Sequence, residues 1–397
     1  MSSRPARSVD EYRETIEQLL RPLAARAVES VPVPEALGRQ LAEEVRSPVD
    51  LPVFRNSAMD GYAVRAESVA SAPVTLPLAG VVAAGNPGET PLPPGGALKV
   101  MTGAPIPPGA DCVVPVEDTH SDGATVTIER GRAAGEFVRE AGTDVRTGDL
   151  LVPAGVALNP RHIAALAAVG LAEVPVFEQI RAAVITTGDE LVPAGSTLRP
   201  GQIYNSNGTA LAAALTANGV AVVSVEHSTD DPTEFHELLD EATDSADLVF
   251  TSGGVSQGDF EVVKDVLAPL GGTFGPVAVQ PGGPQGLTVS DGVPVLSFPG
   301  NPVSTMVSFE VFARPILRKL GGLPEIEIRE LPLLEAVRSP AGRRQFLRGR
   351  VTAEGVEPVS GPGSHLVAGM AWADVLIDVP AEATEVPAGT AVSVRAL

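Results

Sequence analysis

Three short apolar segments in the second half of the chain each run into a loop rich in glycine, hydroxyl or proline residues. The segments are residues 182–185, 248–250 and 293–298, and the loops are residues 186–191, 251–259 and 299–302. A buried strand that opens into such a loop before a helix leaves backbone N–H groups directed at one point, where a phosphate can bind. Three such strand ends at one edge of a sheet predict an anion-binding pocket.

The region that contains these segments, residues 179–322, alternates predicted strands with predicted helices. We predict helices at 208–217, 232–244, 260–267 and 303–320, and strands at 182–185, 220–225, 248–250, 277–279, 286–290 and 293–297. Asp291-Gly292 is expected to join the last two strands in a hairpin. This order predicts a three-layer α/β domain with a mainly parallel sheet, which binds ligands at the carboxyl ends of its strands.

Residues 1–50 and 146–178 together predict a helical, discontinuous scaffold domain. Ser8-Val9-Asp10-Glu11 is a capping box, and apolar residues at helical spacing follow it. Asn159-Pro160 begins a second helix, which Gly170 ends.

Two further regions, residues 51–145 and 323–397, contain short strands interrupted by Pro and Gly. This pattern predicts two small β-rich domains, of which the second is a β-barrel or sandwich. The whole chain is therefore expected to be a multidomain α/β protein.

The charge of the chain is strongly negative. Its 49 Asp and Glu residues against 28 Lys and Arg residues give a formal net charge of −21, which opposes binding to nucleic acid and to anionic membranes. Only three lysines occur, Lys99, Lys264 and Lys319. An anionic ligand must therefore be held by arginine, by backbone N–H groups, or by a divalent cation bridging to carboxylates, which points to Mg²⁺.

No feature of the sequence predicts membrane insertion or export. No apolar stretch approaches the ~20 residues of a membrane span, and residues 1–5 have no apolar segment behind them. The single cysteine, Cys112, lies in an apolar run and is expected to be a buried structural thiol. We therefore expect a cytoplasmic protein.

The residues of the three loops have a structural interpretation beside the functional one. Gly188-Asp189-Glu190 fits a simple turn with a capping aspartate, and the proline-rich third loop fits a rigid elbow. Close approach of a ligand to backbone and hydroxyl groups favours the functional interpretation. The candidate ligand-binding residues are Thr251, Ser252, Gly253, Gly254, Ser256, Pro299, Asn301 and Pro302.

Carboxylates also follow the predicted strands, at Glu190, Asp230, Asp259 and Glu261. Helix caps explain such residues more often than catalysis does, and Asp230-Asp231-Pro232 is typical of a helix start. Because these acids lie in three loops of one sheet edge, they could converge on one divalent cation, with Glu190, Asp230 and Glu261 as its ligands.

Five segments occur in the order and approximate spacing of a known family, at residues 56–63, 101–105, 187–191, 252–258 and 299–302. In these the chain resembles the molybdopterin molybdenumtransferases, the bacterial MoeA proteins, whose eukaryotic counterpart is the E domain of gephyrin. The similarity covers nearly the whole chain. It implies an elongated homodimer of four-domain subunits, in which the α/β domain of one subunit faces the small β domain of the other. It also implies a Mg²⁺-dependent transferase that joins molybdate to the dithiolene of adenylyl-molybdopterin and releases AMP, completing molybdenum cofactor biosynthesis.

The resemblance assigns roles to individual positions. Asp60 and Thr102 match catalytic residues that reach the site from the small β domain, and Glu190 and Asp230 match acidic residues of the α/β domain. Where the family commonly has a third-loop aspartate, this chain has Glu261, so either its longer side chain or Asp259 takes that role. Further substrate-binding matches are the pocket prolines Pro299 and Pro302, then Arg139, Asp144 and Ser364.

The chain departs from the family where lysines would fall near Pro276, Gln280 and Gly283. Each lost cationic contact to a phosphate or to molybdate is worth about 1–3 kcal/mol. The alternative is therefore a gephyrin-like scaffold with weakened or lost catalysis that binds a protein partner through its C-terminal region. A nucleotide-binding α/β protein unrelated to molybdenum is a third hypothesis, which leaves the Asp60 segment unexplained. The resemblance leaves open whether a molybdopterin adenylyltransferase or another protein partner delivers the adenylate.

Overall fold

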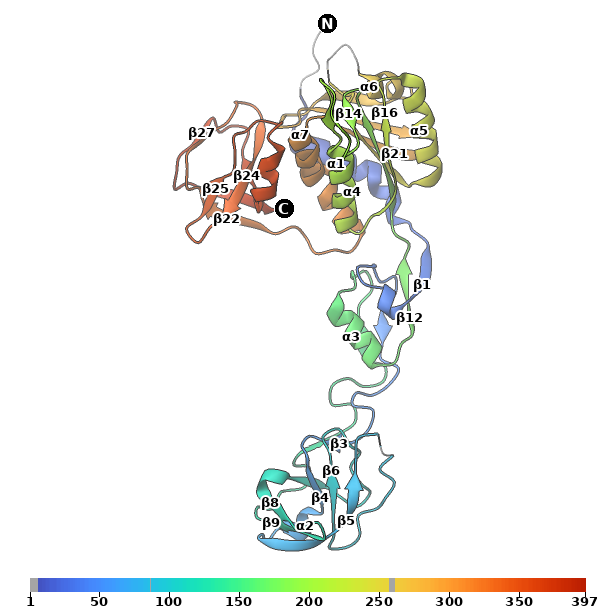
Figure 1. The fold of residues 1–397 in the computed structure, drawn as a ribbon, viewed down its shortest axis with the longest axis vertical. Coiled ribbons are helices and arrows are strands. Elements are labelled where there is room, and N and C mark those ends of the chain that lie inside the picture. The colour runs from blue at the N-terminus through green and yellow to red at the C-terminus, as the bar shows by residue number, and fades with distance from the viewer. Residues whose placement is uncertain (1–5, 86, 257–260) are drawn as a thin grey trace.

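The computed structural model describes residues 6–85, 87–256 and 261–397. The molecule is elongated, with the α/β domain and the C-terminal domain at one end and the β-rich domain at the other, as Figure 1 shows. Within these ranges, none of the helices has the length and apolar character that a membrane crossing requires. The elongated multidomain α/β architecture agrees with the prediction.

The α/β domain is built on a six-stranded sheet with the order β16-β13-β17-β21-β20-β18. The first four strands in this order pair in parallel, and β20 and β18 are antiparallel additions joined to β21. Asp291, in the hairpin between β20 and β21, has a φ of 49°, as such tight turns require. The strands are β13 (Arg181–Thr187), β16 (Ala221–Ser228), β17 (Leu248–Ser252), β18 (Thr273–Pro276), β20 (Pro284–Ser290) and β21 (Val293–Phe298).

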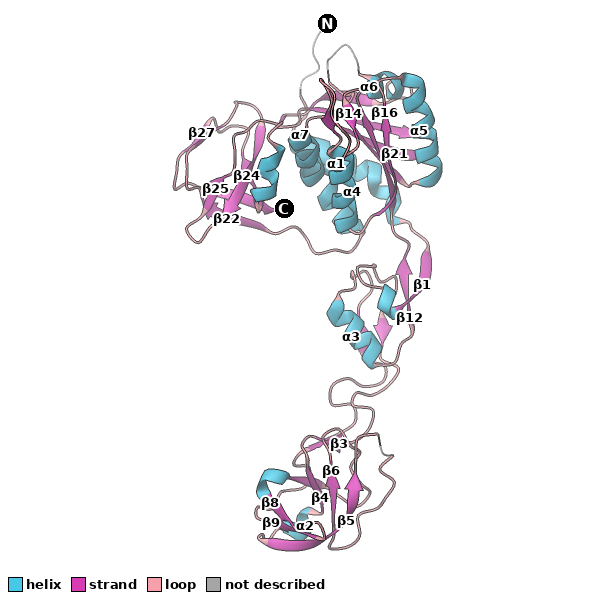
Figure 2. Cartoon of the chain, in the orientation of Figure 1, coloured by secondary structure: helices cyan, strands magenta, loops and turns pink. Residues whose placement is uncertain are grey.

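Helices cover both faces of this sheet and complete three layers (Figure 2). Side chains alternate along a strand, so Phe250 packs with Phe298 and Phe309 on one face, while Val249 packs with Phe235 on the other. The helices are α4 (Asn207–Ala217), α5 (Pro232–Ser245), α6 (Val262–Leu267), α7 (Pro302–Ser308) and α8 (Arg314–Leu320), and a π-helical turn, η4 (Phe309–Ala313), joins the last two. The predicted first residue of α6, Phe260, lies outside the described residues.

The N-terminal helix α1 (Val9–Leu20) belongs to the core of the α/β domain rather than to the scaffold domain where we expected it. Ser8 forms the predicted capping box with Glu11. Tyr12 is fully buried, and its ring meets that of Phe312 edge-on at 4.9 Å between centroids. The apolar stripe of α1 therefore fills the face of the sheet that carries Phe250.

A small unit with a hydrophobic core of its own connects the two ends of the molecule. It pairs β1 (Val28–Pro32) with β12 (Glu173–Phe177), and β2 (Val45–Arg46) with β11 (Leu150–Val152). Helix α3 (Pro160–Ala168) begins at the predicted Asn159 cap, whose side chain accepts hydrogen bonds from the N–H groups of Arg161 and His162. Two short 3-10 turns, η1 (Arg21–Ala24) and η2 (Val33–Glu35), flank β1.

The β-rich domain forms a six-stranded sheet with the order β7-β4-β6-β5-β9-β8. Cys112 is fully buried in it, and burial raises the pKa of its thiol to about 12, so it is a structural thiol as predicted. The elements are β3 (Asn56–Ser57), β4 (Gly61–Val64), α2 (Ala66–Val69), β5 (Val74–Val82), β6 (Ala97–Val100), β7 (Cys112–Pro115), η3 (Val116–Asp118), β8 (Thr119–Ser121), β9 (Thr125–Ile128) and β10 (Val138–Arg139).

The C-terminal domain contains a sheet with the order β19-β24-β26-β28-β22, to which β25 adds at β24. Its first strand, β19 (Val279–Gln280), comes from the segment 277–279 that we expected in the α/β sheet; instead β18 ends at Pro276, which has no N–H to extend a ladder. The order is an open path rather than a closed barrel, and β23 and β27 form a second layer over its core. The other elements are β22 (Ile328–Pro332), β23 (Val337–Arg338), β24 (Arg344–Val351), β25 (Val356–Pro358), η5 (Val367–Trp372), β26 (Val375–Val379), β27 (Glu385–Val386) and β28 (Ala391–Ala396).

Because α1 completes the α/β core, loss of its cap should destabilise that domain. We expect Ser8→Ala to lower the free energy of unfolding by about 1 kcal/mol, since the N–H of Glu11 loses its acceptor. Urea denaturation followed by circular dichroism measures this change. Ser8→Thr keeps the hydroxyl and is the matched control; equal midpoints for the Ala and Thr variants would contradict the role of the cap.

Candidate active site

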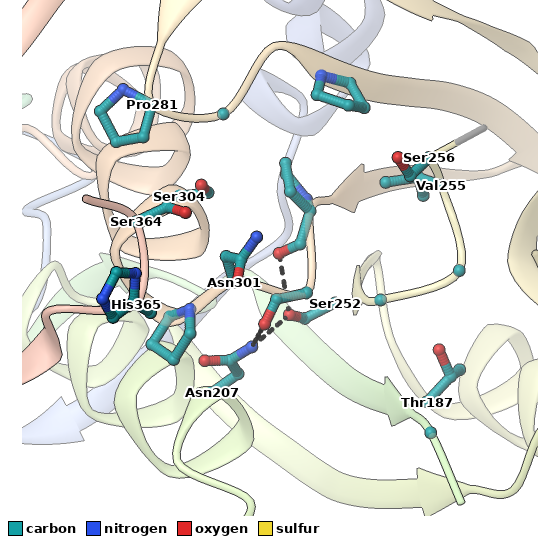
Figure 3. A pocket seen from close by; sticks show the side chains of 18 of the residues that line it. Thr187, Asn207, Ser252, Val255, Ser256, Pro281, Asn301, Ser304, Ser364 and His365 are labelled. Carbon is teal, nitrogen blue, oxygen red and sulfur yellow. Dashed lines mark hydrogen bonds between the residues drawn. The ribbon is translucent and has the colours of Figure 1, made fainter. Parts of the chain in front are cut away.

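The loops that follow β13, β17 and β21 line one pocket of about 760 Å³. Strand β17 pairs in parallel with β13 on one side and with β21 on the other, so the carboxyl ends of all three meet at one sheet edge. Thr187, Ser252 and Asn301 stand at these three ends and surround the pocket in Figure 3. The structure thus brings the three loops together as the sequence predicted.

Glycine is required at the second loop because the loops are packed closely. Gly253 has a φ of +111°, and a Cβ there would lie 2.6 Å from Thr187 Oγ1 and 2.8 Å from the Thr187 carbonyl oxygen. Gly254 has a φ of +60°, and its Cβ would lie 2.9 Å from the backbone nitrogen of Val263. Both positions therefore combine a left-handed backbone with a contact that excludes any side chain.

Asn207, at the start of α4, ties the second and third loops together. Its Nδ2 donates to Ser252 Oγ at 2.9 Å and to the carbonyl oxygen of Gly300 at 2.7 Å. Thr305 Oγ1 donates to the carbonyl oxygen of Pro299 at 2.6 Å and lies 3.2 Å from Ser252 Oγ. These buried bonds, drawn in part in Figure 3, fix the pocket floor before any ligand binds.

Carboxylates gather at one end of the pocket. Glu190, Asp230 and Glu261 all line it, and the N–H of Ser256 donates to Glu261 Oε2 at 2.6 Å. Burial raises the pKa of Asp230, and the neighbouring carboxylates of Asp189, Glu190 and Glu261 raise it further. The three predicted metal ligands are therefore close enough to repel one another.

The donor chemistry of this end suits a hard divalent cation. In the part of the chain that the structure describes, no three His, Cys, Asp or Glu side chains form a complete metal cage. Mg²⁺ does not need one, because it commonly binds one or two carboxylates and completes its shell with water and substrate phosphates. A cluster of carboxylates that repel one another beside glycine amides therefore fits Mg²⁺ bound together with a phosphorylated ligand.

The C-terminal domain supplies the opposite wall of the pocket. Ser364 and His365 lie there (Figure 3), and the N–H of Val303 donates to the carbonyl oxygen of Ser364 at 3.0 Å. Arg343, also from this domain, is exposed and is the only Lys or Arg among the lining residues that the structure describes. One fixed positive charge thus lines the same pocket as the carboxylates.

Most of the predicted α/β-domain and C-terminal site residues lie in this pocket, and Thr251 does not. Side chains alternate along β17, so Thr251 points to the opposite side of the strand from Ser252, which lines the pocket. Thr251 is fully buried there. Asp259 lies outside the described residues. The predicted residues that line the pocket are Glu190, Asp230, Ser252, Gly253, Gly254, Ser256, Glu261, Pro299, Asn301, Pro302 and Ser364.

Four predicted site residues lie in or beside the β-rich domain, at the other end of the molecule (Figure 1). The N–H and Oγ1 of Thr102 both donate to Asp60 Oδ1, at 2.6 and 2.7 Å, and these bonds hold the pKa of Asp60 below its usual value. Arg139 pairs with Asn56 between β10 and β3, and the N–H of Asp144 donates to the Leu51 carbonyl at 2.9 Å. A single chain therefore does not bring these residues to the pocket.

Two of the positions where family lysines would fall, Gln280 and Gly283, line the pocket, whereas Pro276 does not. The segment that carries them runs from the α/β domain into β19 of the C-terminal sheet. Lysines at these two positions would therefore have lined the pocket itself.

Sequence reasoning missed several lining residues. Asn205 and Asn207 stand before and at the start of a predicted helix that follows the first loop, a position that could have indicated them. Tyr204, on the short strand β15 (Ile203–Tyr204) that pairs with β14 (Leu191–Val192), carried no such signal. Arg343 and His365 come from a different domain, so no local pattern pointed to them.

The acidic end predicts a specific titration behaviour. We expect Glu190→Gln to lower the pKa of Asp230, because one of the negative charges that raise it is removed. Carboxyl ¹³C NMR over a pH series measures this shift, and Glu237→Gln on the exposed side of α5 is the matched control.

The same group affects stability. An acid whose pKa is raised by folding stabilises the folded state at low pH, and this contribution is lost as the pH rises through that pKa. Asp230→Asn should therefore stabilise the fold at neutral pH. A folded-state pKa of Asp230 below that of the exposed Asp231, whose pKa the N–H groups of Thr233 and Glu234 lower, would contradict the account.

The chain matches three family models in succession. Residues 7–170 match the MoeA N-terminal region, domains I and II; residues 183–319 match the probable molybdopterin binding domain; and residues 330–397 match the MoeA C-terminal region, domain IV. The residues that line the pocket all fall within the second and third of these matches.

Relatives and solved structures match over the full length. A Mycobacterium tuberculosis protein named molybdopterin molybdenumtransferase 2 is 43% identical over 98% of this chain and 99% of its own, and a Synechococcus elongatus molybdopterin molybdenumtransferase is 39% identical over 97% and 99%. The crystal structure of a molybdopterin biosynthesis MoeA protein from Pyrococcus horikosii superposes with a TM-score of 0.81, at 33% identity over 99% of both chains. The chain belongs to the molybdopterin molybdenumtransferase family, the MoeA proteins.

Proposed function

We propose that this protein transfers molybdate to the dithiolene of adenylyl-molybdopterin and releases AMP. Membership of the family makes it a transferase of molybdenum cofactor biosynthesis. The observation that supports the finer statement is the pocket, which glycine amides, hydroxyls and carboxylates from the strand ends line together with an arginine of another domain. A nucleotide-tailed, phosphorylated pterin and a small oxyanion need these groups together.

The second and third loops hold the phosphates and the pterin in this proposal. The N–H groups of Gly253 and Gly254, with Ser252 and Ser256, offer neutral donors that cost less to desolvate than ammonium groups. Thr187 Oγ1 is buried at the rim without a hydrogen-bond partner among the described residues. A ligand oxygen would satisfy that hydroxyl.

Arg343 binds molybdate in this proposal and substitutes for the family lysines. Its planar guanidinium can donate two parallel hydrogen bonds to a tetrahedral oxyanion. Arg343 is exposed within the pocket wall, and no ion pair or hydrogen bond to another described residue occupies it.

Glu190 and Asp230 would hold Mg²⁺ beside the phosphates, with Glu261 accepting the N–H of Ser256. A cation held by these carboxylates would supply charge stabilisation for the release of AMP. Because the pKa of Asp230 is raised, its carboxylate is protonated at a higher pH than that of an ordinary aspartate. As the pH falls, Asp230 should therefore lose its affinity for a cation earlier than an ordinary aspartate would.

A second subunit completes the site in this proposal. Asp60 and Thr102 lie at the far end of the chain from the pocket, and the low pKa of Asp60 keeps it ionised and ready to position molybdate or accept a proton. A homodimer that places the β-rich domain of one subunit over the pocket of the other would unite them.

A gephyrin-like scaffold is not favoured. The full-length relatives are named as transferases, and the pocket retains Glu190, Asp230 and Glu261. A partner-binding scaffold would not require this acidic set.

The first test is AMP release from adenylyl-molybdopterin with Mg²⁺ and molybdate. We expect Glu190→Gln to slow release at least about 100-fold through lost charge stabilisation, and Arg343→Met to raise the KM for molybdate about tenfold or more. Arg338→Met removes an exposed arginine of the same domain away from the pocket and should match wild type. AMP release that does not depend on molybdate in the wild-type protein would contradict the proposal.

A mixing experiment tests the shared site. Asp60→Asn and Glu190→Gln subunits, each nearly inactive alone, should regain about a quarter of the wild-type rate after random reassociation, because half the dimers then hold one intact site. Mixing Asp230→Asn with Glu190→Gln subunits is the control and should restore nothing. If both mixtures stay inactive although the subunits exchange, the site is not shared between chains.

A further inference from the structure

The C-terminal sheet presents a charged face to the α/β domain, apart from the pocket. Along β28, Val392 and Val394 point into the core of the C-terminal domain, so the alternating Arg395 points the other way. Its neighbour across the ladder, Leu376, packs with the α/β core, as does Phe346. Arg395 therefore lies in the contact between the two domains.

Five arginines and three carboxylates meet in this contact, which we call the arginine seam. The electrostatic neighbours of Arg395 are Arg13, Arg344, Glu310 and Asp378, and those of Glu310 also include Arg314 and Arg318. The third carboxylate, Asp10, contacts Arg13 and Arg344. Five guanidinium groups against three carboxylates give this contact an excess of positive charge, in a chain of net charge −21.

Every carboxylate of the seam is already engaged by an arginine other than Arg395. Arg344 Nε and Nη2 donate to the two oxygens of Asp378 at 2.8 and 2.6 Å. Arg314 Nη1 donates to Glu310 Oε2 at 2.5 Å. Arg395 therefore has Glu310 and Asp378 as electrostatic neighbours, but neither carboxylate pairs with its guanidinium in the described ranges.

Arg395 is 7% exposed, and its guanidinium makes no hydrogen bond or ion pair with any residue of the described ranges. Its Nε is one of three buried guanidinium nitrogens of the seam without a partner, together with Arg13 Nη2 and Arg314 Nε. Burying an uncompensated charge is costly, and a satisfied hydrogen bond or a counter-charge normally offsets that cost.

We propose that the arginine seam binds a small tetrahedral oxyanion, of the chemistry shared by sulfate, phosphate and molybdate, with Arg395 as its principal ligand. A guanidinium offers two parallel N–H donors to such an anion, and the unpartnered nitrogens of Arg13 and Arg314 supply further donors. Water would satisfy the donors but not the excess charge. None of these three arginines lines the candidate active site, so this anion site is separate from it.

The test is the thermal stability of the full chain in chloride buffer and in buffers of equal ionic strength that contain sodium sulfate, phosphate or molybdate. We expect the oxyanions to raise the Tm of the wild-type protein by a few degrees more than that of Arg395→Met, because the ligand stabilises only the intact site. Apparent affinity from the Tm series should fall at least about tenfold in Arg395→Met. General salting-out by sulfate acts on both proteins and cancels in the comparison.

Two control variants separate this site from the pocket and from net charge. Arg343→Met removes the arginine of the pocket and with it any oxyanion response of the pocket, and the response that remains should be lost when Arg395→Met is added. Arg338→Met changes the net charge equally at an exposed position and should keep the full oxyanion response. In chloride, Arg395→Met should be no less stable than wild type, since it removes a buried guanidinium with which no carboxylate pairs directly.

A crystal soaked in molybdate gives the second readout, through anomalous scattering of molybdenum. Density beside the guanidinium of Arg395 would support the proposal. Equal Tm responses of wild type and Arg395→Met, or molybdenum density confined to the pocket near Arg343, would overturn it. If the Tm of the wild-type protein were the same in chloride as in the three oxyanion buffers, the proposed class of ligand would be overturned.

Discussion

The parallel pairing of β13, β17 and β21 is the constraint on which the pocket depends. It places three loops at one edge of the sheet, and the contact between Gly253 and Thr187 leaves no room for a side chain between the first two. Asn207 then holds the second loop to the third through Ser252 and Gly300. Because these contacts are buried and mutually supporting, the floor is fixed by the fold and needs no ligand to form it.

The electrostatics of the chain follow from its scarcity of lysine. At the strand ends, neutral hydroxyls and backbone amides line the pocket together with a group of carboxylates and one arginine from the C-terminal domain. In contrast, the contact between the α/β and C-terminal domains concentrates arginines, including the unpartnered Arg395. The two proposed anion sites thus coincide with these arginines, in a chain whose net negative charge opposes binding to nucleic acid.

Local patterns predicted those parts of the fold that local interactions determine. The Ser8 and Asn159 caps, the Asp291-Gly292 hairpin and the strand–helix order were read from neighbouring residues and are confirmed. The assignment of α1 to the scaffold domain and of residues 277–279 to the α/β sheet was wrong, because tertiary packing and strand partners decide both. The pocket loops were predictable for the same local reason, whereas Arg343 enters from another domain and Thr251 is turned away by strand alternation.

The central claim is that a nucleotide-tailed pterin binds across the second and third strand-end loops. Hydrogen exchange followed by mass spectrometry, with and without adenylyl-molybdopterin, tests it most directly. The account predicts slower exchange of the backbone amides of residues 252–256 and of Gly300 and Asn301, which line the pocket. Unchanged exchange there, with protection confined to the second depression of the molecule around residues 66–72 and 129–133, would contradict it.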